Sequence, residues 1–147
     1  DKRLDFCKNQ LEVAHTVNAK SSDVREQISA ITHGGMPTVV IDCTGNQRAI
    51  NNALEYLAHG GRYVLIGLQK GDLIFPHPEF HKRESTLMSS RNATRMDFIH
   101  VMQCIQNGLV KPEDFITHRI AFDQLKDIFE ILPDPASETI KAVVYMD

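Results

Sequence analysis

The chain has 147 residues, 42% of them hydrophobic, which is enough to bury one core, or one core plus a smaller satellite piece. Sixteen Lys and Arg residues oppose nineteen Asp and Glu residues, and the net charge of -3, without a basic stripe, argues against nucleic acid as a partner. No apolar run approaches the roughly 20 residues that span a bilayer, and no leader pattern is present. The 3 cysteines are also far apart. The sequence therefore predicts a cytoplasmic protein with no membrane partner.

Apolar residues at helical spacing begin almost at once, at Leu4, Cys7 and Leu11. This pattern predicts that the chain starts inside a helix whose preceding strand is not part of this sequence. A doubly wound sheet normally opens with a strand, a G-x-G-x-x-G loop and a helix, and that loop occurs nowhere in the sequence. We therefore expect the chain to be a fragment of a larger protein.

A short strand and a second helix are predicted next. Residues 15–19 have moderate strand character. Asp23 and Glu26 then form a D-x-x-E capping pattern at the start of a helix, which the glycines at 34–35 end.

The segment from Thr38 to Gly67 predicts a strand, a helix and a second strand. The unbroken β-branched run at 38–41 is typical of a strand buried on both faces. Asn46 opens a one-sided helix, and 63–66 is the return strand. Since two such strands run parallel, Gly45 and Gly67 should emerge side by side at one edge of the sheet.

The alternation of helices and strands becomes irregular after Gly67. Residues 69–83 predict a loop with a short extended piece, and 85–90 predict a strand. The remaining elements are a helix ended by Gly108, an extended run at 115–122, a helix at 125–132 and a strand at 140–146. The fold class is therefore α/β, an incomplete Rossmann-type parallel sheet with helices on both faces, followed by a C-terminal segment.

His77 and His81 are the best metal candidates among the 7 histidines. Helical spacing would place them on one face, but Pro76 and Pro78 should prevent that helical turn. We therefore predict no metal ligand in this chain and treat both histidines as solvated loop residues.

Taken in order, four segments resemble the C-terminal part of zinc-containing medium-chain alcohol dehydrogenases. These are DCTGNQRAINNALEYLAHGGRYVLIGL, SRNATRM, NGLVKPEDFITHRIAF and ETIKAVVYM. The resemblance is greatest to the sorbitol and polyol dehydrogenase branch. It implies that residues 1–90 form the later part of an NAD(P)-binding Rossmann domain. Residues 91–147 would then be the segment that returns to complete the catalytic domain.

The same resemblance implies a set of cofactor contacts. They are Cys43, Thr44, Gly45, Ile66, Gly67, Leu68, Ser89, Ser90 and Lys141. Glycine at a strand end also suits this role physically, because it lets the backbone approach a flat ligand that a Cβ would keep away. A glycine after a strand is also common in an ordinary turn. Cys43 has a second interpretation as a small buried apolar residue.

Arg91 matches an arginine that binds the hydroxyl groups of a polyol, although an arginine at a strand end can equally form a surface salt bridge. The resemblance implies a small alcohol or polyol as substrate and NAD or NADP as cofactor. It also implies a zinc ion whose ligands lie outside this chain, so we predict no catalytic residue here and an inactive fragment. A homodimer or homotetramer is implied as well, with Leu73, Ile74 and Phe75 pairing as an edge strand across two subunits; a packed intrachain loop is the alternative.

Two other classes of function stay open on the residues alone. A Rossmann-like methyltransferase also has a strand that ends in Asp-x-x-Gly and a later GGRYVLI, but it usually has an early glycine-rich loop and a reversed last strand. A non-catalytic binding or dimerisation module is compatible with a chain that lacks zinc ligands.

Overall fold

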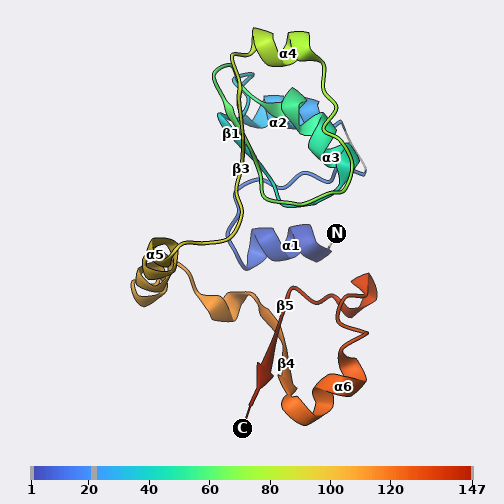
Figure 1. The fold of residues 1–147 in the computed structure, drawn as a ribbon, viewed down its shortest axis with the longest axis vertical. Helices are drawn as coiled ribbons and strands as arrows, with labels where there is room; N and C mark the ends of the chain where they lie inside the picture. The colour runs from blue at the N-terminus through green and yellow to red at the C-terminus, as the bar shows by residue number, and fades with distance from the viewer. Residues whose placement is uncertain (1, 21–22, 147) are drawn as a thin grey trace. The chain divides into compact units, whose positions relative to one another are not determined.

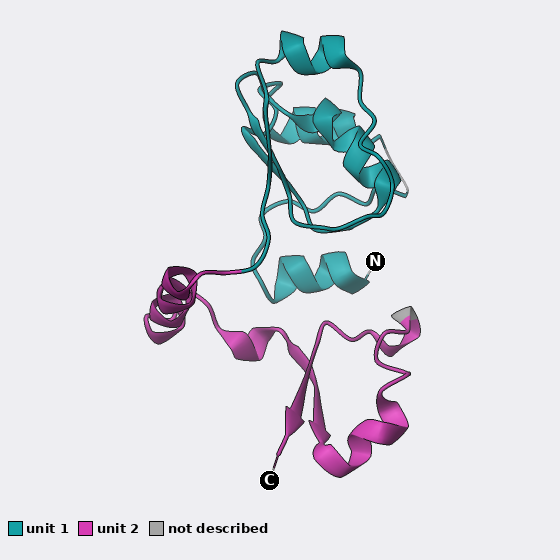
Figure 2. Cartoon of the chain, viewed as in Figure 1, with its two compact units in different colours: residues 1–92 teal, residues 93–147 magenta. Residues whose placement is uncertain are grey.

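The computed structural model describes residues 2–20 and 23–146. The chain divides into two compact units, Asp1–Asn92 and Ala93–Asp147 (Figure 2). Each unit contains a parallel β-sheet, and the first contains the strand–helix–strand element that the sequence predicts.

A three-stranded parallel sheet forms the centre of the first unit (Figure 1). Its strands lie side by side in the order β1 (Val39–Asp42), β2 (Arg62–Leu65) and β3 (Thr86–Ser89). The register pairs Asp42 with Leu65, and Leu65 with Ser89, so all three strands end at the same edge. The predicted strands and their parallel pairing are confirmed.

The connection from β1 to β2 is helical because Asn46 caps the start of a helix. The Asn46 side-chain oxygen accepts hydrogen bonds from the backbone N–H groups of Arg48 and Ala49, at 3.1 and 3.2 Å. Helix α3 (Gln47–Asn52) then tightens into the 3-10 helix η1 (Ala53–Tyr56). The core of the unit is formed by Ile50, Ala53, Leu54, Leu57 and Tyr63.

The prediction that β1 is covered on both faces is wrong. Val39 and Ile41 are 49% and 55% exposed, whereas Val40 is half-buried and Asp42 is buried. The strand alternates because α3 and η1 cover one face of it, and no described element buries the opposite face.

Two helices precede the sheet in the chain. They are α1 (Lys2–Asn9) and α2 (Val24–Ile31). The Asp23 carboxylate accepts a hydrogen bond from the Glu26 backbone N–H at 3.0 Å, which confirms the capping pattern. The strand predicted at 15–19 is wrong, because this segment has no hydrogen-bonded strand neighbour within the described residues.

The loop predicted at 69–83 contains helix α4 (His77–Lys82). Pro76 is the N-cap of this helix and Pro78 lies in its first turn, where the missing proline N–H costs nothing. The earlier segment containing Leu73 and Ile74 forms no strand, and the Phe75 ring packs on the Phe80 ring with centroids 5.2 Å apart.

The second unit contains α5 (Arg95–Gln106), β4 (Ile116–Ala121), α6 (Leu125–Ile128) and β5 (Lys141–Tyr145), with 3-10 turns η2 (Pro112–Asp114), η3 (Phe122–Gln124) and η4 (Pro135–Ser137). Strands β4 and β5 pair in parallel. A capping box between Thr94 and Asp97 starts α5, and Gly108, at φ +71°, follows its end. The helix predicted at 125–132 is shorter than expected, since it ends at Ile128. None of the described helices combines the length and hydropathy needed to cross a lipid bilayer.

Candidate functional site

Asp42, the last residue of β1, holds two consecutive strand-end turns. It is only 5% exposed, and its carboxylate oxygen Oδ1 accepts from the Thr44 hydroxyl at 2.6 Å and from the Thr44 N–H at 3.3 Å. The other oxygen, Oδ2, accepts from the Gly45 N–H at 3.3 Å. The Asp42 backbone carbonyl accepts from the N–H groups of Ile66 and Gly67, both at 2.9 Å. One residue therefore organises the ends of β1 and β2.

The turns after β1 and β2 are in direct backbone contact. Gly45 has φ +60°, and a Cβ built on it would lie 2.8 Å from the Leu68 carbonyl oxygen. A Cβ built on Gly67 would overlap the Gly45 nitrogen and lie 2.5 Å from Asp42 Oδ2. Only glycine fits at either position without moving backbone atoms. The prediction that Gly45 and Gly67 emerge side by side is confirmed.

A cleft lies where the sheet strands end. We call it the strand-end cleft, and it is lined by Ile50, Leu65, Ile66, Gly67, Leu68, Gln69, Gly71, Leu73, Ser89, Ser90 and Arg91. The Ser90 N–H donates to the Leu65 carbonyl at 2.9 Å, which ties the third strand end to the second. Leu68 is 92% exposed, and an apolar side chain this open at a concave site is typical of a surface that binds a ligand or another segment.

The strand-end cleft gathers six of the predicted site residues, which are Ile66, Gly67, Leu68, Ser89, Ser90 and Arg91. Gly45 does not line the cleft, but it packs against the backbone of Leu68, which does. Thr44 and Cys43 are exposed beside the first turn, so the alternative of a buried apolar Cys43 is wrong. Lys141 is the exposed first residue of β5 in the second unit, and its cofactor role stays a prediction.

A family model described as zinc-binding dehydrogenase matches residues 1–107. This chain belongs to the zinc-binding dehydrogenase family. The resemblance inferred from its sequence motifs is thereby confirmed, and the family is one of oxidoreductases.

Two curated relatives are much longer than this chain. The chain is 40% identical over 128 residues to L-galactonate-5-dehydrogenase of Escherichia coli K12, covering 87% of this chain and 38% of that protein. It is 29% identical over 140 residues to D-xylulose reductase of Scheffersomyces stipitis, covering 90% of this chain and 38% of that protein. The chain thus spans about two fifths of the length of these relatives.

A solved structure confirms the fold. The crystal structure of a short chain alcohol dehydrogenase from Escherichia coli CFT073 in complex with NADH superposes with a TM-score of 0.88 at 23% identity, covering 99% of this chain and 42% of that one. At this identity the likeness shows a Rossmann-like α/β fold with parallel strands.

The described residues do not form the zinc site that the family description names. Among residues 2–20 and 23–146, no three His, Cys, Asp or Glu side chains are grouped so that they could hold a metal ion. His77 and His81 do lie on one helix, α4, with ring centroids 5.9 Å apart, so the prediction that Pro76 and Pro78 prevent this helical turn is wrong. A pair of side chains falls short of the three protein ligands of a catalytic zinc site.

Sequence reasoning missed two features of the candidate site. The first is Asp42, which a signal in the sequence could have identified, namely an acidic residue that ends a β-branched strand three residues before a glycine. The second is the Gln69 side chain, which bonds both the N–H and the carbonyl of Gly71 and so shapes the cleft rim. No pattern in the neighbouring sequence predicts these two hydrogen bonds between Gln69 and Gly71.

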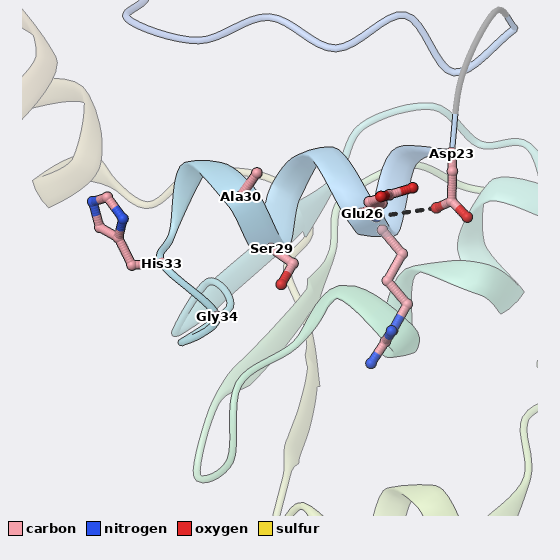
Figure 3. Close-up of a pocket in the computed structure, with 7 residues that line it drawn as sticks. Asp23, Glu26, Ser29, Ala30, His33 and Gly34 are labelled. Carbon is pink, nitrogen blue, oxygen red and sulfur yellow. Dashed lines mark hydrogen bonds between the residues drawn. The ribbon is translucent and has the colours of Figure 1, made fainter.

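A second hollow lies on the outer side of α2 (Figure 3). Asp23, Glu26, Ser29 and His33 line it, and the Asp23 carboxylate is already used as the helix cap. None of the residues that line it is buried. The strand-end cleft is therefore the better candidate site.

Proposed function

We propose that this chain forms the nucleotide side of an NAD(P)-dependent dehydrogenase that oxidises a secondary alcohol of a polyol or sugar acid. Residues 1–90 form the later part of the cofactor domain, and residues 91–147 complete the catalytic domain. The observation that supports this proposal is the contact of Gly45 with Gly67 at the carboxyl ends of parallel strands. Ligands of open α/β sheets bind at such strand ends.

The cofactor would lie along the strand ends, with its nicotinamide ring accepting hydride from the alcohol. Cys43, Thr44 and Gly45 would border the adenosine and ribose side, and Ile66, Gly67 and Leu68 the nicotinamide side. The hydroxyl and backbone groups of Ser89 and Ser90 would orient the carboxamide. Lys141 would provide a positive charge for the pyrophosphate. The exposed apolar surface of Ile66 and Leu68 would exclude water from the ring once it is bound.

Arg91 would bind the substrate. It is the charged residue that lines the strand-end cleft, and within the described residues no hydrogen bond or ion pair occupies its guanidinium. A guanidinium donates in a planar fork that matches two adjacent hydroxyls or one carboxylate. Sugar alcohols and sugar acids both present such groups. Of two relatives, L-galactonate-5-dehydrogenase is named for a sugar acid, and D-xylulose reductase for a keto sugar whose reduction gives a sugar alcohol.

The finer assignments follow from the same family likeness. The protein would act in the cytoplasm as a homodimer or homotetramer. Leu73 and Ile74, which are 41% and 65% exposed, would lie in the contact between subunits. The chain by itself would be inactive, because its described residues supply no zinc site. NAD and NADP are both compatible with the residues of this chain.

The experiment is a dehydrogenase assay on the complete gene product that carries this chain. Reduction of NAD and of NADP is followed at 340 nm with L-galactonate, xylitol, sorbitol and a primary alcohol. We expect turnover with at least one sugar acid or polyol and little with the primary alcohol. A protein that is folded and zinc-loaded yet inert toward every substrate with both cofactors contradicts the proposal.

A further inference from the structure

The first strand-end turn directs its N–H groups inward. The N–H groups of Thr44 and Gly45 both donate to the Asp42 carboxylate, at 3.3 Å each. The Asn46 N–H donates to the Thr44 hydroxyl oxygen at 3.1 Å, and that hydroxyl in turn donates to Asp42 Oδ1. Three consecutive amides are therefore used inside the protein. A phosphate bound at this turn would find no free backbone N–H among residues 44–46.

The carboxylate is also part of the packing between the turns. Its Oδ2 occupies the space where a side chain at position 67 would begin, 2.5 Å from the position of a built Cβ. The Asp42 carbonyl at the same time holds the N–H groups of Ile66 and Gly67. A buried carboxylate is costly unless donors surround it, and here three donors do so.

We propose that Asp42 is a positioning residue for the nucleotide. By binding the N–H groups of the first turn, it fixes Gly45 against Gly67 and makes that turn a surface for an uncharged part of the cofactor instead of a phosphate. This inference rests on the proposed function. It adds a residue that does not itself contact the cofactor and that acts through Thr44 and Gly45.

The substitution Asp42→Asn separates positioning from simple packing. The amide has nearly the same volume, but its NH₂ group must face either the Thr44 N–H or the Gly45 N–H, so one of these donors loses its acceptor. The matched control is Glu55→Gln, which removes one negative charge from an exposed residue of η1 in the same unit. Both variants are made in the complete gene product.

The expected result is a selective loss of cofactor affinity. For Asp42→Asn, the Kd for NADH by fluorescence titration and the KM for NAD should rise about tenfold, while kcat changes less than about twofold. Amide hydrogen exchange should accelerate at residues 44 and 45 but not in the β1–β2 ladder. Glu55→Gln should match the wild type in all four measurements. A folded Asp42→Asn protein with unchanged NADH affinity and unchanged exchange at 44 and 45 overturns the proposal.

A second variant covers the case in which Asp42→Asn does not fold. Thr44→Val keeps the carboxylate but removes the 2.6 Å hydroxyl bond, and it should raise the Kd for NADH about threefold, whereas Thr44→Ser should restore it. Equal affinities for the Val and Ser variants overturn the proposal. Failure of the wild type to bind NADH is a failure of the proposed function, and the exchange rates at 44 and 45 then still test the hold of Asp42 on the turn.

Discussion

Gly67 touches the backbone nitrogen of Gly45, so that two turns 22 residues apart in the sequence share one packing surface at the end of the sheet. This contact leaves no volume for a side chain at position 67. It makes the shape of the strand-end cleft depend on the absence of two Cβ atoms.

The substitution Gly67→Ala should therefore damage both stability and cofactor binding. The new Cβ would overlap the Gly45 nitrogen and press on Asp42 Oδ2, and such overpacking costs about 1–3 kcal/mol of unfolding free energy. Urea unfolding followed by circular dichroism measures the first effect, and NADH titration the second. Gly35→Ala is the control, because its Cβ would meet only the Thr32 carbonyl, at 3.3 Å. A Gly67→Ala protein as stable as Gly35→Ala would contradict the contact described here.

Truncation of Leu57 should lower stability, whereas truncation of Leu68 should weaken cofactor binding. Leu57 is 0% exposed, so Leu57→Ala should lower the unfolding free energy by about 2–5 kcal/mol, the cost of an emptied core site. Leu68 is 92% exposed, so Leu68→Ala should change stability by less than about 0.5 kcal/mol and instead weaken NADH binding. Thermal unfolding and fluorescence titration of the two variants measure these effects. If Leu68→Ala bound NADH as tightly as the wild type, Leu68 would have no place in the cofactor site.

Arg91 should determine substrate affinity without affecting the cofactor. We expect Arg91→Gln in the complete gene product to reduce kcat/KM for the best sugar acid or polyol by about 10- to 100-fold, with Arg91→Lys in between, because a single ammonium cannot replace the planar fork. The Kd for NADH should stay within about twofold of the wild type. Arg62→Gln, at an exposed residue of β2, serves as the control. An Arg91→Gln enzyme with wild-type kcat/KM would show that Arg91 is a surface residue only.

The start of helix α5 should weaken in acid. Hydrogen bonds from the Thr94 N–H and hydroxyl hold the pKa of the Asp97 carboxyl below its ordinary value, with a smaller contribution from His100. A carboxyl whose pKa is lower in the folded state stabilises that state above its unfolded pKa, and the effect is lost as the pH falls through the folded pKa. Carbon-detected NMR titration should show the low pKa of Asp97. Amides in the first turn of α5 should lose protection from hydrogen exchange when this carboxyl becomes protonated. Thr94→Ala should return the pKa toward the ordinary value; no change on this substitution would contradict the capping box.

Tyr63 should ionise only in strong alkali. Burial, and then the negative charge of Asp42, raises its pKa to about 12, while its hydroxyl donates to the Ile50 carbonyl at 2.8 Å. A group with a raised folded-state pKa gives its full stabilisation below its unfolded pKa, near 10, and loses it as the pH rises through the folded value. Absorbance at 295 nm should show a late ionisation step that is absent in Tyr63→Phe. A wild type without that late step would contradict the buried hydroxyl bond.

Much of the first unit could be predicted because its signals are local. Asn46 caps a helix with its own side chain, and the apolar spacing behind it decides which face is buried, so the strand–helix–strand element follows from neighbouring residues. The parallel pairing of the flanking strands then follows from the helical crossover. The same local reasoning fails at α4, because Pro76 and Pro78 predict a break, whereas Pro76 is the N-cap of this helix and Pro78 lies in its first turn.

The family, the order of most elements and the two glycine turns could be predicted, because motifs, helix caps and turns are patterns of residues close together in the chain. Only the folded molecule shows which face of β1 is covered, that residues 15–19 lack a strand partner among the described residues, and that Asp42 joins the turns after β1 and β2. Burial and hydrogen-bond pairing depend on groups that the chain brings together only when it folds. The acceptors of Asp42 reach donors on two separate turns, and no spacing rule within one segment encodes that convergence.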